Sequence, residues 1–151
     1  NCSVDGNKII YKHYVNMGVA VALDNGLVVP NVPYADKKSL SEISSEVREL
    51  AELARSGKLP MERLHGGTFT ITNLGMYGIE SFSPIINQPE TAILGVCAMQ
   101  DKPVVLDGKI TVRTMMNLCL TADHRVVDGA IAAQFLHRVK TLMENPALML
   151  A

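Results

Sequence analysis

The alternation of apolar and polar positions predicts β-strands over much of this chain. In residues 15–23 every second side chain is apolar, which is typical of a strand with one buried face: Val15, Met17, Val19, Val21 and Leu23. Residues 68–73 alternate threonine with phenylalanine and isoleucine, and residues 91–96 form an almost wholly apolar run typical of a strand buried on both faces. Further strands are predicted at residues 8–14, 27–32, 104–106, 109–112 and 115–121.

Two segments carry the helical period instead. The first opens at the capping box Ser39-Leu40-Ser41-Glu42, stops at Gly57 and Pro60, and places five apolar residues on one stripe: Leu40, Ile43, Val47, Leu50 and Ala54. The second covers residues 129–144, ends at Asn145-Pro146, and is expected to turn five residues inward: Ile131, Phe135, Leu136, Val139 and Met143. Several strands in a mixed β-sheet with two long helices predict an α/β fold, a two-layer sandwich.

Composition limits the function classes. With 151 residues and 48% hydrophobic content the chain is expected to form one domain. A net charge of −1 without a basic block argues against nucleic-acid binding, and the apolar runs are too short to cross a membrane. Three widely spaced cysteines argue against a disulfide framework or a zinc site, so a reducing, cytoplasmic compartment is expected. The chain begins in what reads as the middle of a hairpin, so a fragment is expected and a preceding mitochondrial transit peptide stays open.

The stretch His124-Arg125-Val126-Val127-Asp128-Gly129 is the strongest candidate for chemistry. It places an imidazole and a carboxylate four positions apart, where a predicted strand gives way to a helix. Histidine is well suited to remove a proton from a thiol or hydroxyl near neutral pH. An equally open reading is a helix start, with Asp128 as N-cap and Gly129 for backbone clearance. No metal site is predicted, because His124 and Asp128 lack a third ligand at suitable spacing.

The threonine row of residues 68–73 is a second candidate. Such a row is most often a solvated or half-buried strand face. In the functional reading Thr72, at the end of the strand, donates a hydrogen bond to an oxyanion, while Gly75 and Gly78 allow another backbone or a long ligand to approach closely.

Four stretches together resemble the catalytic domain of dihydrolipoamide acyltransferases, the core acyltransferase component of 2-oxoacid dehydrogenase complexes. They occur in family order and cover essentially the whole chain: residues 24–30 (DNGLVVP), 66–75 (GGTFTITNLG), 83–87 (SPIIN) and 122–130 (ADHRVVDGA). The histidine motif also occurs in chloramphenicol acetyltransferase. The resemblance to the dihydrolipoamide acyltransferases implies a chloramphenicol-acetyltransferase-like fold for this chain. Residues 1–151 are similar to the C-terminal part of the catalytic domain. Its N-terminal portion, the lipoyl domain and the peripheral-subunit-binding domain are not represented.

The resemblance implies roles for individual residues. His124 matches the general base, Thr72 the hydroxyl that binds the tetrahedral oxyanion from a neighbouring subunit, and Asp128 the carboxylate that organises the loop around the histidine. Contacts to coenzyme A are expected at three further positions: Asn73, Gly75 and Ser83.

The implied reaction is transfer of an acyl group between a dihydrolipoyl group, carried on a separate domain, and coenzyme A as cosubstrate. Residues 74–78 resemble acetyl-type members, those of the pyruvate dehydrogenase complex, more than succinyl-type ones. Implied partners are further copies of the chain, in a trimer or in trimers assembled into a cubic or dodecahedral core, together with 2-oxoacid dehydrogenase and dihydrolipoamide dehydrogenase subunits. A non-catalytic structural core module is the alternative, and a free-standing antibiotic acetyltransferase is a more distant one.

Overall fold

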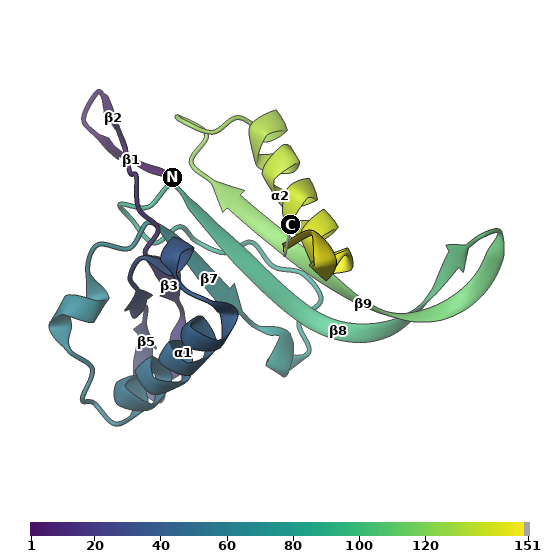
Figure 1. The fold of residues 1–151 in the computed structure, drawn as a ribbon, viewed down its shortest axis with the longest axis horizontal. Coiled ribbons are helices and arrows are strands. Elements are labelled where there is room, and N and C mark those ends of the chain that lie inside the picture. Colours follow the sequence, from purple (N-terminus) through teal and green to yellow (C-terminus); the bar gives the residue numbers. More distant parts are fainter. Residues whose placement is uncertain (150–151) are drawn as a thin grey trace.

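The central element of the fold is a five-stranded sheet with the strand order β6-β3-β7-β8-β9 (Figure 1). The computed structural model describes residues 1–149. The strands are β3 (Met17–Val19), β6 (Asn31–Val32), β7 (Phe69–Asn73), β8 (Ala92–Leu106) and β9 (Lys109–Ala122). Strand β7 runs parallel to both β3 and β8, whereas β6 and β9 pair antiparallel at the two edges. The mixed sheet expected from the sequence is therefore confirmed.

Two small hairpins flank this sheet. One joins β1 (Cys2–Asp5) to β2 (Lys8–Tyr11), and the other joins β4 (Val21–Leu23) to β5 (Gly26–Val28). The prediction of one strand over residues 15–23 is wrong, because the chain leaves the main sheet at Ala20 and pairs with its own continuation. The predicted strand at residues 27–32 is likewise divided, at Val29-Pro30, since proline has no N–H to donate to a neighbouring strand.

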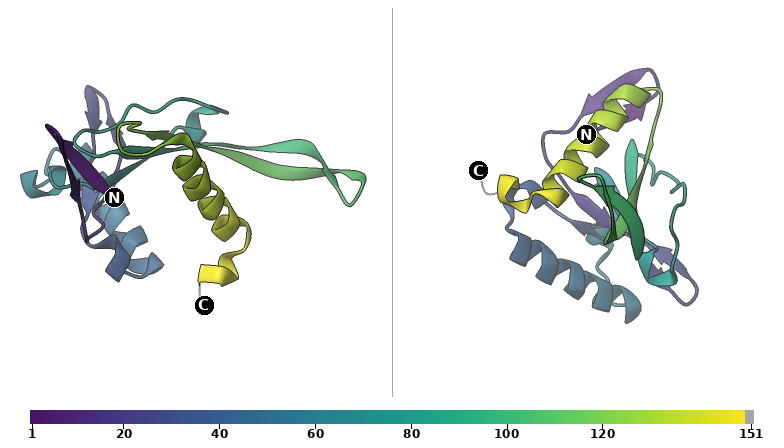
Figure 2. Two further views of the ribbon diagram at one scale, coloured as in Figure 1. Left: turned by 90° about the horizontal axis from the view of Figure 1, so that it is seen from above. Right: turned by 90° about the vertical axis from the view of Figure 1, so that its right-hand side faces the viewer.

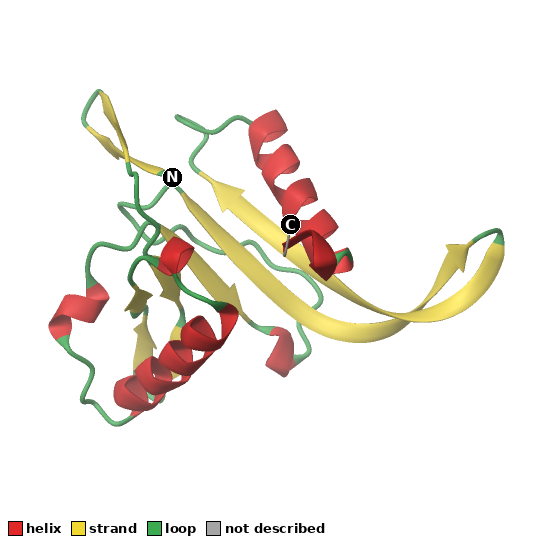
Figure 3. Cartoon of the chain, in the orientation of Figure 1, coloured by secondary structure: helices red, strands yellow, loops and turns green. Residues whose placement is uncertain are grey.

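Both long helices lie on one side of the sheet, which gives the predicted two layers (Figures 2 and 3). They are α1 (Leu40–Arg55) and α2 (Gly129–Glu144). Short 3₁₀ turns occur at η1 (Ala35–Lys37), η2 (Met61–Leu64), η3 (Gly75–Tyr77) and η4 (Pro146–Met149). An extended segment, residues 78–91, crosses the opposite side of the sheet (Figure 2).

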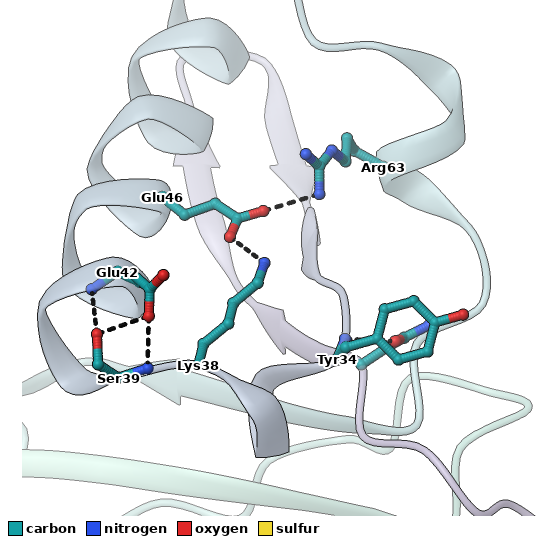
Figure 4. Close-up of polar contacts among 7 residues, drawn as sticks. Tyr34, Lys38, Ser39, Glu42, Glu46 and Arg63 are labelled. Atoms are coloured by element: carbon teal, nitrogen blue, oxygen red, sulfur yellow. Dashed lines mark hydrogen bonds and ion pairs between the residues drawn. The ribbon is translucent and has the colours of Figure 1, made fainter.

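Helix α1 begins at the predicted capping box (Figure 4). The Ser39 backbone N–H donates to Glu42 Oε2 at 2.8 Å, and the Glu42 backbone N–H donates to Ser39 Oγ at 3.3 Å. Glu46, one turn later, pairs with Lys38 and with Arg63, the latter at 2.8 Å. This network joins the helix to the loop before it and to η2.

The apolar stripe of α1 contributes to the core mainly through its C-terminal half. Of the predicted stripe, Leu50 and Ala54 are buried, whereas Leu40 in the first turn is 77% exposed.

Helix α2 departs more clearly from the prediction. Leu136 and Val139 are half-buried, but Ile131, Phe135 and Met143 are 54%, 45% and 56% exposed. These three do not point into a closed core, because the helix packs on the edge strand β9 and part of its apolar side has no neighbour within residues 1–149.

Strands β8 and β9 are much longer than predicted. The separate strands expected between residues 91 and 121 belong to one long antiparallel pair, whose register shifts between Val96 and Met99. The inner part of β8 is buried on both faces as predicted, as Ile93 and Leu94 show. The outer part projects away from the body of the molecule (Figure 1) and exposes apolar side chains such as Ile110 and Val112.

Candidate active site

The turn that carries His124 is held at both ends by hydrogen bonds. Strand β9 ends at Ala122, and the Asp123 backbone N–H then donates to the Thr91 carbonyl at 2.8 Å. The Val127 backbone N–H donates back to the Asp123 carbonyl at 3.0 Å. His124 is exposed at the tip of this turn.

Asp123 also fixes the residue on the far side of His124. The Arg125 guanidinium donates to its carboxylate through Nε at 2.9 Å and through Nη2 at 2.6 Å, and the Arg125 backbone N–H adds a third bond at 3.0 Å. The Arg125 guanidinium therefore holds the pKa of the Asp123 carboxyl below its usual range. His124 thus sits between two residues that bind each other.

Asp128 caps helix α2. Its Oδ1 accepts from the Ile131 backbone N–H at 2.9 Å, and its carbonyl accepts from the Ala132 N–H at 3.0 Å. The helix-start reading of Asp128 is confirmed. An N-cap also fixes where the helix begins, so it constrains the turn that presents His124.

Thr72 differs from the two threonines that precede it on the same strand face. Thr68 and Thr70 are 2% and 1% exposed, and their hydroxyls donate to the Asn16 carbonyl and to Glu90 Oε2 at 3.2 Å and 2.6 Å. The expectation of a solvated or half-buried row is therefore wrong for these two. Thr72 is half-buried, and its hydroxyl has no hydrogen-bond partner among the described residues. The hydroxyl is free to donate to a ligand.

The chain turns sharply after Thr72. Asn73 Oδ1 accepts from the Gly75 backbone N–H at 2.8 Å, so the side-chain oxygen of Asn73 is used by the turn. A Cβ at Gly75 would lie 2.6 Å from the Cys97 carbonyl oxygen, so only glycine fits there. The predicted close backbone approach at this glycine is confirmed.

Ser83 lies on the side of the sheet opposite the helices. It is exposed and, with neighbours from residues 81–84, lines a cavity of ≈ 320 Å³ against Cys119 and Thr121 of β9. The preceding Phe82 ring covers Gly95, where a Cβ would lie 2.7 Å from the ring.

Within one protomer the two candidate groups stand at opposite ends of the sheet. Strand β7 ends with Thr72 and Asn73, and β9, which runs in the opposite direction, leads to His124 (Figure 1). Thr72 pairs with Gly95, and Gly95 pairs with Cys119, five residues before His124. With strands about 4.8 Å apart and about 3.3 Å per residue, the Cα atoms of Thr72 and His124 are roughly 15–20 Å apart. The two side chains of one protomer therefore cannot reach the same substrate atom.

Sequence patterns did not indicate that the carboxyl group of Glu90 is buried next to Thr70. Glu90 is 4% exposed and accepts from Thr70 at 2.6 Å and from Asn87 Nδ2 at 3.2 Å. Burial raises the pKa of its carboxyl, although both hydrogen bonds act in the opposite direction. Nearby, Asn31 Oδ1 is buried without a partner. A glutamate before a strand ordinarily reads as solvent-exposed, and its main partner is 20 residues away in sequence.

Within residues 1–149, no group of three or more histidine, cysteine, aspartate or glutamate side chains is placed to hold a metal ion. None of the helices in that range has the length and apolar character needed to span a membrane.

Comparison with known proteins agrees with this architecture. The whole chain, residues 1–151, matches the family model described as 2-oxoacid dehydrogenases acyltransferase (catalytic domain). A succinyltransferase component of the 2-oxoglutarate dehydrogenase complex from Bartonella vinsonii subsp. berkhoffii is 52% identical over 97% of this chain and 36% of its own length. An acetyltransferase component of the pyruvate dehydrogenase complex from Rickettsia felis is 47% identical over 99% of this chain and 36% of its length. The chain thus spans about a third of these relatives.

Solved structures extend the agreement to the fold. The dihydrolipoamide acetyltransferase of Azotobacter vinelandii superposes with a TM-score of 0.95 at 43% identity, over 100% of this chain and 63% of that one. The cubic core of a pyruvate dehydrogenase multienzyme complex also gives a TM-score of 0.95, at 44% identity and the same coverage. The predicted α/β sandwich of the chloramphenicol-acetyltransferase type is confirmed. The chain belongs to the family of 2-oxoacid dehydrogenase acyltransferases, whose catalytic-domain model it matches over residues 1–151.

Proposed function

We propose that this domain transfers an acyl group between a dihydrolipoyl group and coenzyme A, with His124 as general base and Thr72 as oxyanion donor. One observation carries the assignment of residues. In the Azotobacter enzyme, the catalytic roles of a serine, a histidine and an asparagine have been investigated; the serine lies 52 positions before the histidine and the asparagine four after it. Here Thr72 lies 52 positions before His124, and Asp128 lies four after it. A hydroxyl is kept at the first position, and a carboxylate replaces the amide at the third.

The chemistry suits these groups. A thiol with a pKa of about 8.5 is mostly protonated at pH 7, whereas an imidazole with a pKa of about 6.5 is mostly the free base. His124 removes the thiol proton as the sulfur attacks the thioester carbonyl. The Thr72 hydroxyl donates to the oxyanion of the tetrahedral intermediate. When the intermediate collapses, the second sulfur leaves as a thiolate and takes the proton from His124.

The geometry of the protomer supports a site shared between subunits. Thr72 and His124 lie at opposite ends of one sheet, so a complete site requires Thr72 from one protomer and His124 from another. An assembled arrangement agrees with the similarity to the cubic core of a pyruvate dehydrogenase complex. A trimer within such a core, with the dehydrogenase subunits as further partners, is part of the proposal.

The coenzyme A contacts are proposed at Asn73, Gly75 and Ser83. Asn73 would donate through its side-chain NH₂ group, because its side-chain oxygen accepts a hydrogen bond within the turn. The carried group is proposed to be acetyl. The similar proteins include both acetyl- and succinyltransferases, so the assay compares both dihydrolipoyl thioesters.

Mixing two inactive variants tests the proposal. His124→Ala removes a base worth about 10²–10⁴-fold, and Thr72→Ala removes a donor worth about 10²–10³-fold, in acyl-transfer rate. If each site takes one residue from each of two neighbours, random 1:1 assembly from unfolded chains restores about a quarter of the parental sites. Coenzyme A-dependent thioester formation is measured with each variant alone and with the co-refolded mixture.

His137→Ala is the matched control, because His137 is exposed on α2 outside the turn, and it should keep parental activity. Absence of recovery in the mixture would show that the two residues act within one subunit or not at all. Parental activity in His124→Ala would favour the alternative, a structural core module without turnover.

A further inference from the structure

Two cysteines without a proposed catalytic role lie side by side on the face opposite the helices. The Sγ atoms of Cys97 on β8 and Cys119 on β9 are 3.8 Å apart. Both are free thiols, as is Cys2. Their positions, 22 residues apart in sequence, do not indicate such a contact.

The register shift of the long hairpin places them together. Gly95 is the direct partner of Cys119, and the pairing is interrupted between Val96 and Met99, so Cys97 lies within the irregularity. In a regular sheet, side chains in diagonal positions have Cβ atoms farther apart than the roughly 4 Å of a disulfide. The local distortion of β8 brings the two sulfur atoms into contact.

The two thiols differ in accessibility. Cys119 is half-buried and lines the ≈ 320 Å³ cavity with Ser83 and other residues of the 81–84 segment. Cys97 lies behind it and is only 2% exposed. Burial raises the pKa of the Cys97 thiol, and the neighbouring Cys119 raises it further. Cys119 is therefore the thiol that a small reagent meets first, and Cys97 is placed to react second.

We propose that Cys97 and Cys119 form a dithiol site that small organic disulfides oxidise reversibly. The Cys119 thiolate attacks one sulfur of the reagent, the reagent S–S bond breaks, and one thiolate leaves. Cys97 then loses its proton to solvent and attacks Cys119 Sγ in the mixed disulfide, which expels the second thiolate. Two protein thiols are oxidised to one disulfide, and one reagent disulfide is reduced to two thiols.

The test uses the intact, assembled protein and 2-hydroxyethyl disulfide as the reagent. After exposure, remaining thiols are alkylated under denaturing conditions and the protein is digested with trypsin for mass spectrometry. Because Pro103 blocks cleavage after Lys102, Cys97 lies in the peptide of residues 64–109, and Cys119 lies in that of residues 114–125. We expect these two peptides to be joined, with the link exceeding the Cys119 mixed disulfide by about tenfold or more because the second thiol is already in position. Dithiothreitol should separate them.

Two variants and an internal control define the mechanism. Cys97→Ser should accumulate the mixed disulfide at Cys119, whereas Cys119→Ser should leave Cys97 reduced. Cys2, buried at 6% exposure, should stay alkylatable in all samples. A persistent mixed disulfide at Cys119 in the parent protein, or both thiols still reduced when a free cysteine peptide in the same tube is oxidised, would overturn the proposal.

Discussion

Replacing Thr70 with valine should destabilise the protein while leaving the acyl-transfer rate nearly unchanged. The same change at Thr72 should lower the acyl-transfer rate while leaving the stability nearly unchanged. The two threonines lie two residues apart on one face of β7, so they share strand, orientation and backbone pairing. They differ in what the hydroxyl does: the hydroxyl of Thr70 donates to Glu90 at 2.6 Å in a buried site, whereas that of Thr72 has no partner among the described residues.

The magnitude follows from that difference. Valine at position 70 leaves a buried carboxyl oxygen without its donor, which costs about 1–3 kcal/mol in the free energy of unfolding. Since the Thr70 hydrogen bond lowers the pKa of Glu90, its loss raises that pKa further. The variant then binds a proton more tightly than the parent in the folded state. The loss in the free energy of unfolding caused by Thr70→Val is therefore smaller at pH 5 than at pH 8, where Glu90 must ionise without the donor. At Thr72 the corresponding cost is within about 0.5 kcal/mol.

Urea unfolding followed by circular dichroism, at one protein concentration and at both pH values, measures the stabilities. Acyl-transfer rates are measured below the unfolding transition. Thr72→Val should lose about 10²–10³-fold in rate through the missing oxyanion donor, whereas Thr70→Val should retain most of the parental rate. Equal unfolding midpoints for the two variants would show that the Thr70–Glu90 contact does not stabilise the fold. Equal rates would remove Thr72 from the mechanism.

Three further changes test separate parts of the structure by the same unfolding measurement. Ser39→Ala removes the cap of α1 and should cost about 1 kcal/mol, whereas Ser44→Ala, exposed within the same helix, should cost nothing measurable. Gly95→Ala places a methyl group 2.7 Å from the Phe82 ring and should cost about 1–3 kcal/mol, part of which Phe82→Leu should recover. Glu90→Gln should flatten the pH dependence of stability. The raised pKa of Glu90 makes the parent protein lose stability as pH rises from 5 to 8, whereas the glutamine amide does not titrate. Parallel pH profiles of stability for the variant and the parent would contradict this role of Glu90.

The parts of the fold that could be predicted from sequence are those decided by neighbours along the chain. The capping box of α1 and the Asp128 cap of α2 involve residues three positions apart, so their signals are local. Alternation located most of the strand residues, but it carries no information about the partner strand. The pattern of residues 15–23 therefore read as one strand, although Gly18 pairs with β7 and β6 and Ala22 pairs within a separate hairpin.

The candidate site divides in the same way. His124, Asp128 and Thr72 could be selected by residue type and motif, but their separation could not, because it depends on β7 and β9 running in opposite directions. The burial of Glu90 could not be predicted, because it depends on packing against Thr70, which is 20 residues away in sequence. The exposed apolar side of α2 was predicted to be buried because helical periodicity shows which face is apolar and not what covers it.

The antiparallel relation of β7 and β9 has a consequence for how catalysis depends on structure. Thr72, the proposed oxyanion donor, lies on a central strand held by neighbours on both sides, and His124, the proposed base, lies in a turn anchored by Asp123 and by the cap of α2. In the proposed arrangement, each half of the site is held in place by the hydrogen bonds of its own protomer, as catalytic geometry requires. The distance between the halves would then be set by the interface between protomers. A substitution that leaves both halves intact but shifts this interface by about 1 Å should therefore lower the turnover rate strongly while hardly changing the stability of the single domain.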